Sequence, residues 1–137
     1  MEIKKGYDFL NRIRTCDNKI RRLKYTLAEL RSCELPRSGG DGVAVQHSRD
    51  GSQIERIACR IVELENELAD ALEQKGIVVM EIDNALRKLP EGPEKTILYD
   101  CYIAREPMKR IADSVGYSLK HTYRLRRKAI ESLEDIT

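Results

Sequence analysis

Basic side chains gather near the C-terminal end of the chain with no acidic residue among them. Between residues 118 and 128 there are five lysines or arginines and no aspartate or glutamate. Lysine and arginine attract phosphate groups by charge, and arginine can also donate paired hydrogen bonds to a phosphate or to the O6 and N7 atoms of guanine. The chemistry available to this stretch is therefore the binding of a polyanion. The five residues are Lys120, Arg124, Arg126, Arg127 and Lys128.

The residues in front of this stretch have the spacing of two helices joined by a tight turn, at about residues 108–115 and 118–134. Gly116 follows Ala112 by four residues, and Ser118 opens the second helix. A small alanine lets two helices cross closely, and glycine can adopt a positive φ at the turn. Serine is a good N-cap because its hydroxyl accepts a hydrogen bond from a free N–H. This pattern is typical of a DNA-binding helix-turn-helix.

A further helix is predicted ahead of these two, at about residues 94–104. The segment 89–93, LPEGP, marks its start, because Pro93 suits the first turn of a helix. The inward positions are expected to be Ile97, Leu98, Cys101 and Tyr102 on this helix, and Thr122, Leu125, Ala129 and Leu133 on the last one. Together these elements predict a small three-helix domain over residues 90–137.

Two longer helical patterns precede this domain, at about residues 7–33 and 53–89. Apolar residues in both recur at steps of three and four, which is a heptad seam. A glycine- and serine-rich linker, residues 36–52, joins them. The first seam is Ile13, Cys16, Ile20, Leu23, Leu27 and Leu30; the second is Ile54, Ile57, Ile61, Leu64, Leu68 and Ala71, continued by Val78, Ile82 and Ala85 and broadened by Leu72, Val79 and Leu86.

The fold class expected from these patterns is all-α. Residues 1–89 are expected to form an antiparallel, coiled-coil-like helical hairpin, followed by the helix-turn-helix domain of residues 90–137. The first long helix is net basic and the second net acidic, which favours their pairing. Because two helices alone bury little surface, we expect the hairpin to self-associate into a homodimer or a higher homo-oligomer.

Several other classes of protein are not expected. No apolar run approaches the roughly 20 residues that span a bilayer, and the N-terminus lacks the apolar block of a signal peptide, so a cytoplasmic protein is expected. The sequence has no nucleotide-binding loop, hydrolase elbow or metalloprotease motif, so neither an enzyme nor a cofactor is predicted. No metal or disulfide is predicted either. Each cysteine is expected to pack on an apolar helix face: Cys16, Cys33, Cys59 and Cys101.

The last 49 residues resemble region four of sigma-70-type transcription factors. The segment from Val115 to Ser118 and the tail YRLRRKAIESL look closer still to phage-encoded, sigma-like late transcription regulators, which often carry a helical region ahead of the helix-turn-helix. The chain has no tryptophan and lacks the aromatic-rich helix with which sigma region two melts promoter DNA. The matching landmarks are Leu89-Pro90, Ile97-Leu98, Tyr102, Ile111-Ala112, Val115-Gly116-Tyr117-Ser118, Arg127-Lys128-Ala129 and Leu133.

The resemblance implies a phage or prophage protein that binds promoter DNA in a bacterial cell and works with RNA polymerase. Position on the last helix predicts base contacts from its first two turns and phosphate contacts from residues beside and beyond them. The base-contacting candidates are Leu119, Lys120, His121, Tyr123 and Arg124. The phosphate-contacting candidates are Lys109, Arg110, Ser118, Arg126, Arg127 and Lys128.

The predicted function is that of a sequence-specific transcription regulator that binds double-stranded DNA. Two alternatives stay open at this point. A small terminase subunit of a phage also joins a helix-turn-helix to a coiled region, but forms rings of many copies. A helical protein-interaction module would use the same domain to bind a protein, and the basic stretch would then be a solvated helix face.

Overall fold

The computed structural model describes residues 2–34 and 51–136, with side chains described for 5–33 and 51–135. Every regular element in these ranges is a helix, which confirms the predicted all-α class for them. No helix within the described ranges has the length and apolar character needed to cross a bilayer. The elements are α1 (Glu2–Glu34), α3 (Gly51–Leu86), α4 (Pro93–Leu98), the π-helical turn η1 (Tyr99–Ile103), α5 (Met108–Val115) and α6 (Leu119–Ile136).

The chain forms two compact units. Residues 16–74 form one, which we call the two-helix unit; residues 1–15 and 75–137 form the other, the multi-helix unit. Both long helices therefore contribute residues to each unit. The expected domain boundary between residues 89 and 90 stays a prediction about which part of the chain folds alone. Of the predicted linker, residues 36–50 lie outside the described residues, and residues 51 and 52 already belong to α3.

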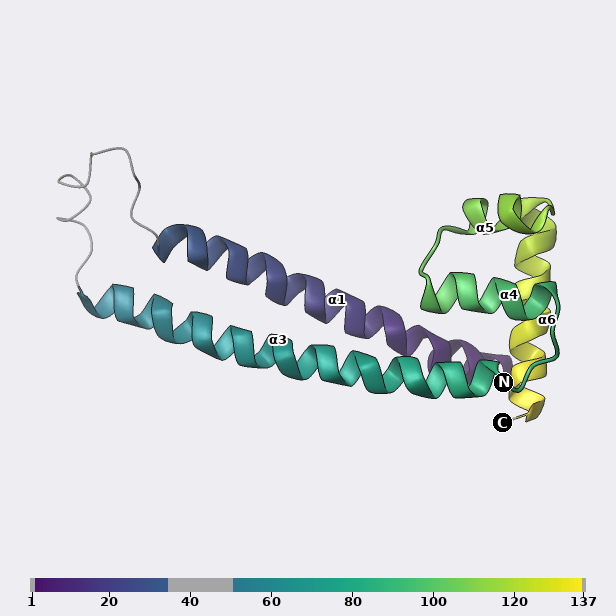
Figure 1. Ribbon diagram of the computed structural model, residues 1–137, viewed down its shortest axis with the longest axis horizontal. Helices are drawn as coiled ribbons and strands as arrows, with labels where there is room; N and C mark the ends of the chain where they lie inside the picture. Colours follow the sequence, from purple (N-terminus) through teal and green to yellow (C-terminus); the bar gives the residue numbers. More distant parts are fainter. Residues whose placement is uncertain (1, 35–50, 137) are drawn as a thin grey trace. The chain divides into compact units, whose positions relative to one another are not determined.

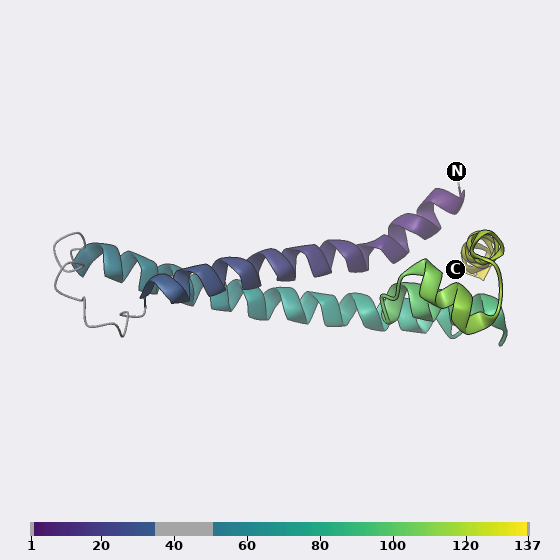
Figure 2. The ribbon, with the colours of Figure 1, turned by 90° about the horizontal axis from the view of Figure 1, so that it is seen from above.

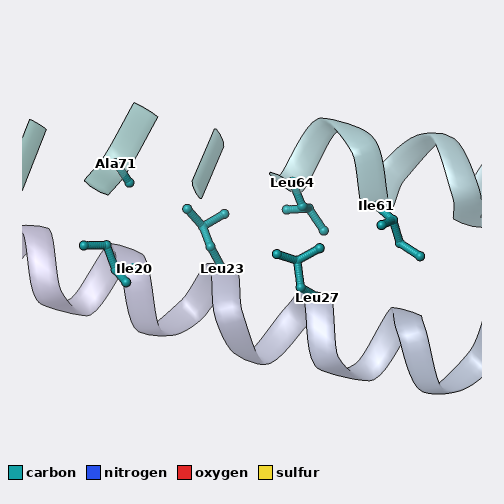
Figure 3. Close-up of a cluster of buried hydrophobic side chains, with 6 residues drawn as sticks. All are labelled: Ile20, Leu23, Leu27, Ile61, Leu64 and Ala71. Carbon is teal, nitrogen blue, oxygen red and sulfur yellow. The ribbon is translucent and has the colours of Figure 1, made fainter. Parts of the chain in front are cut away.

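In the two-helix unit, α1 and α3 lie side by side and run in opposite directions (Figures 1 and 2). Ile20 lies opposite Ala71, and Leu27 lies opposite Leu64 (Figure 3). Leucines and isoleucines one heptad step apart thus meet in a single row, as the sequence pattern predicts. The buried cluster consists of Ile20, Leu23, Leu27, Ile61, Leu64 and Ala71, with Leu30, Ile57 and Leu68 partly buried against it.

Four residues assigned to apolar faces are instead exposed: Ile54, Leu72, Cys33 and Cys59. The predictions for these four were wrong. Leu72, Cys33 and Cys59 stand beside the narrow row that a helix with one neighbour buries, whereas Ile54 stands on that row but at the start of α3. Leu72 follows the seam residue Ala71 by one position, which is a rotation of about 100° away from α1. The other two cysteines are less exposed, since Cys16 is half-buried and Cys101 is buried.

In the multi-helix unit, both α4 and α5 pack against α6 (Figure 1). The residues predicted to face inward on the helix at 94–104 and on the last helix are buried, except Leu125, which is half-buried. Ile130 is fully buried although it was not predicted to be. The buried set is Ile97, Leu98, Cys101, Tyr102, Ile111, Ala112, Thr122, Ala129, Ile130 and Leu133, joined by Leu10 and Ile13 of α1 and by Val78, Ile82, Ala85 and Leu86 of α3.

The predicted helix over residues 94–104 is correct only in its first half. It begins at Pro93, as expected, but from Tyr99 onward it widens into a π-helical turn in which the N–H of Ala104 donates to the carbonyl oxygen of Tyr99 at 2.9 Å. Arg105 then adopts a φ of 61° in the left-handed region, which stops the helix. Single π-helical turns are rare and occur mostly inside α-helices, and the residue spacing in this segment did not reveal this one.

The first turns of α1 belong to the multi-helix unit because they pack against α6. A Cβ atom built on Gly6 would lie 2.5 Å from Cγ2 of Ile130, so the glycine allows the α1 backbone to come very close to this side chain. Helix α1 begins at Glu2, several residues before the predicted start. The beginning of the first long helix therefore supports the last helix, which the sequence pattern did not predict.

Candidate nucleic-acid interface

The turn between α5 and α6 has the predicted geometry. Gly116 has φ 81° and ψ 25°, in the left-handed region that glycine adopts at little cost. The N–H groups of Gly116 and Tyr117 both donate to the carbonyl oxygen of Ala112, at 3.0 and 3.1 Å. Ser118 Oγ accepts a hydrogen bond of 3.1 Å from the N–H of His121. The sequence-based predictions of a left-handed glycine and a serine N-cap are therefore confirmed.

Buried side chains fix the angle between α5 and α6. Ile111 and Ala112 of α5 are buried, as are Thr122 and Ala129 of α6. The threonine hydroxyl is satisfied because it donates to the carbonyl oxygen of Ser118 at 2.8 Å. Its methyl group can thus fill an apolar site without leaving an unpaired polar group. The first turns of α6 are consequently held in place by both packing and hydrogen bonds.

The opposite face of these first turns is exposed. Leu119 and Tyr123 are each 44 % exposed, although both are large and apolar in character. Lys120 and Arg124 are exposed beside them, and neither forms an ion pair with a residue that the structure describes. Positions 119, 120, 123 and 124 lie on one side of a helix because they repeat at three and four residues. The structure therefore brings together four of the five predicted base-contacting residues.

The fifth, His121, is placed differently. It is half-buried, and its ring meets the ring of Tyr117 edge-on at a centroid distance of 4.9 Å. This contact occupies the space between the turn and the first turn of α6. His121 therefore contributes to the packing of the turn, and its side chain is less accessible than those of Lys120 and Arg124.

The predicted phosphate-contacting residues fall into two groups. Lys109 and Arg110, near the start of α5, are exposed and form no ion pair within the described ranges. Arg127 and Lys128 are also exposed, and each lies near one carboxylate: Arg127 Nε is 3.7 Å from Glu131, and Lys128 Nζ is 3.9 Å from Glu94. Such exposed pairs are worth little, so all four cations are accessible to an anion. Ser118 is exposed as well, with its hydroxyl oxygen used in the N-cap.

Arg126 does not share this exposed face. Its guanidinium carbon lies 5.0 Å from the ring centre of Tyr123 and 5.7 Å from that of Tyr7, and its Nη1 lies 3.8 Å from the sulfur of Cys101. Its Nε is buried without a hydrogen-bond partner. Burial alone lowers the pKa of Arg126, but Tyr102 and Cys101 raise it above its ordinary value, so the side chain stays charged.

The inward position of Arg126 has a signal in the sequence. It follows the buried Thr122 by four residues and precedes the buried Ile130 by four, so it lies on the inner side of α6. The charge of the side chain obscured this spacing. Tyr7, its partner on α1, carried no signal because the contact joins the two ends of the sequence.

Comparisons of the chain with protein-family models, with curated proteins and with solved structures gave no match. Within residues 5–33 and 51–135, no three His, Cys, Asp or Glu side chains come together as the ligands of a metal ion would. The arrangement that remains is an exposed row of cations and apolar side chains on a helix held from behind. Such a row can attract an anionic surface by charge and contact its apolar parts.

Proposed function

We propose that this protein is a sequence-specific transcription regulator that binds double-stranded DNA through α6. The observation that carries this proposal is the exposed face of the first turns of α6, where Lys120 and Arg124 have no ion-pair partner among the described residues. The helix behind this face is fixed by α5 through a left-handed glycine turn. A helix presented in this way fits the major groove of B-form DNA.

Each exposed side chain has a distinct role in the proposed complex. Lys120 and Arg124 donate hydrogen bonds to the O6 and N7 atoms of guanine, and a good bidentate pair discriminates by about 1–3 kcal/mol. Leu119 and Tyr123 provide apolar surface for thymine methyl groups. The phosphates are bound outside the groove by Lys109, Arg110, Arg127 and Lys128. Arg126 is left out of this set, because its guanidinium contacts Tyr7 and Tyr123.

RNA polymerase is the proposed protein partner. The support for it is the resemblance of the last 49 residues to sigma region four, and the proposed site of action is therefore a promoter. The arrangement proposed for the chain is a helical hairpin that oligomerises, followed by a helix-turn-helix domain.

The experiment that tests this function is selection of bound duplexes from a random DNA library, at two salt concentrations. The wild-type protein is compared with Lys120→Ala/Arg124→Ala. A matched control, Lys19→Ala/Arg22→Ala, removes the same charge from exposed positions of α1. We expect one enriched motif with the wild type and the control, and none with the variant in α6.

Two outcomes would overturn the proposal. One is the absence of any enriched motif, and the other is a motif that survives Lys120→Ala/Arg124→Ala. In either case the molar mass in solution separates the alternatives, because a small terminase subunit forms a ring of many copies and a protein-interaction module does not need to.

A further inference from the structure

An exposed apolar stripe follows α3 within the two-helix unit. Val62, Ala69 and Leu72 each stand one residue after a seam residue of α3, so each is rotated by about 100° away from the contact with α1. Val62 is 55 % exposed and Leu72 is 47 % exposed. Helix α3 is thus apolar on two adjacent sides, of which α1 covers one. A helix with two apolar sides is typical of a bundle with more than two helices.

The corresponding flank of α1 faces the same side of the helix pair. Arg31 follows the seam residue Leu30 by one position, as Glu65 follows Leu64, and these two charged side chains form an ion pair. The residues that follow the seam of α1 by one position therefore lie next to the residues that follow the seam of α3 by one position. On α1 this flank is Arg21, Lys24 and Ala28, with the 65 % exposed Tyr25 beside it.

The two helices of this unit have opposite charges. Residues 16–33 of α1 hold five basic and two acidic side chains, whereas residues 51–74 of α3 hold six acidic and two basic ones. Most of these charges are not neutralised between the two helices. Those that form no ion pair with any described residue include Lys19, Arg22 and Lys24 on α1 and Glu55, Asp70 and Glu73 on α3.

We propose that a second copy of this chain docks on this face to form a four-helix assembly. A two-fold axis parallel to the helices places the basic α1 of each copy on the apolar stripe and acidic flank of α3 in the other. Both contacts are then equivalent, as a closed dimer requires. A rotation about this axis leaves the height of each residue along the bundle unchanged, so equivalent residues of the two copies lie at the same height. Since Ile20 lies level with Ala71, Arg21 of the second copy lies beside Asp70 and Glu73.

This dimer surface specifies the oligomerising hairpin of the proposed function, but it does not depend on DNA binding. It is built from residues 16–74 alone, and its test does not use DNA. The base-selection experiment can therefore fail while the dimer is confirmed, and the reverse also holds.

The first test is the mass of the full-length protein by sedimentation equilibrium. We expect twice the 15.8 kDa of one chain. Leu72→Glu places a carboxylate in the proposed interface and should weaken the dimer by about tenfold or more. Ile77→Glu is the matched control, because Ile77 is similarly exposed at 43 % but lies five residues, or about 140°, further round α3. Circular dichroism verifies that both variants stay helical.

The second test identifies which helix covers the stripe. Arg21→Glu/Lys24→Glu should weaken the dimer, and adding Asp70→Lys/Glu73→Lys should restore it, because the attraction is re-established with reversed signs. A monomeric wild type, or a dimer equally sensitive to Leu72→Glu and Ile77→Glu, would overturn the proposal. A charge reversal that is not rescued would overturn the pairing of α1 with α3 of the second copy.

Discussion

At the scale of single residues, the absence of a side chain at Gly6 lets the backbone of α1 approach α6 closely. The α1 backbone at Gly6 lies very close to Ile130, which is fully buried. Gly76, in the middle of α3, has no such role, because a Cβ atom there would meet nothing within 4 Å. The two glycines thus have opposite effects on stability: Gly6 permits a close approach between helices, and Gly76 only weakens α3.

Substitution of both glycines by alanine tests this difference. We expect Gly6→Ala to lower the free energy of unfolding by about 1–3 kcal/mol, because overpacking forces backbone or side-chain shifts. We expect Gly76→Ala to raise it by about 1 kcal/mol, which is the difference in helix propensity. Urea denaturation followed by circular dichroism measures both. Equal effects of the two substitutions would contradict the close contact at Gly6.

The buried hydroxyl of Tyr102 makes the stability sensitive to alkaline pH. Burial raises the pKa of Tyr102 from 10.0 to about 12. The unfolded chain therefore loses this proton at lower pH than the folded chain does, so stability falls as the pH rises from 10 to 12, by roughly 2 kcal/mol for this group. In Tyr102→Phe the loss of stability over this range should be smaller. Denaturation curves at pH 9 and pH 11.5 decide, and an unchanged loss would refute the assignment.

The residue scale also shows where sequence reasoning stops. The exposure of Lys120 and Arg124 could be predicted, because they are polar and lie on the side of the helix opposite Thr122 and Ala129. The spacing of Arg126 from Thr122 and Ile130 is that of a buried residue, but its charged side chain is typical of an exposed one. Only the aromatic rings of Tyr7 and Tyr123 resolve this conflict, and Tyr7 is far away in the sequence.

At the scale of elements, local signals determined the ends of α5 well. Helix α5 has the bounds predicted for it, 108–115, since Pro107 precedes it and Gly116 ends it. The seams of α1 and α3 were predicted from the heptad spacing. The exposed Leu72 was not, because spacing shows that a side is apolar without showing how many neighbours cover it. The π-helical turn η1 was also missed, since no residue type marks it.

The N-cap of α6 gives a prediction at this scale. Ser118→Ala removes the oxygen that accepts the N–H of His121, so the free energy of unfolding should fall by about 1 kcal/mol. Ser114→Ala, at an exposed position within α5, is the control and should be neutral or slightly stabilising. Thermal denaturation of both variants provides the measurement. A loss at Ser114 as large as that at Ser118 would argue against the cap.

At the scale of the whole molecule, the small net charge of +2 hides strong local charges. The basic face of α5 and α6, the basic α1 and the acidic α3 nearly cancel in the sum. Net charge therefore says little about the partners of this chain, and the arrangement of charges on helices says much more. The sequence predicted this segregation, but it did not reveal that residues 1–15 and 75–137 form one compact unit.

Salt dependence of DNA binding tests the charge arrangement. If the four proposed cations each neutralise one phosphate, the logarithm of the binding constant should fall with the logarithm of salt concentration at a slope of about −3.6. Arg127→Ala/Lys128→Ala should reduce that slope by about 2, whereas Lys19→Ala/Arg22→Ala should leave it unchanged. Fluorescence anisotropy of a labelled duplex at several salt concentrations gives the slopes. The same slope for all three proteins would remove Arg127 and Lys128 from the phosphate contacts.

The packing of Gly6 and Tyr7 against α6 also constrains the order in which the chain folds during its synthesis. Residues 16–74 make most of their contacts within their own unit, so the partners of that unit are all present once residue 74 has left the ribosome. The first turns of α1 leave the ribosome earlier still, but their partners Arg126 and Ile130 are made more than a hundred residues later. Until then these first turns, which include the buried Leu10, lack their contacts with α6. A ribosome paused before α6 should therefore display a nascent chain that chaperones recognise at its N-terminal end.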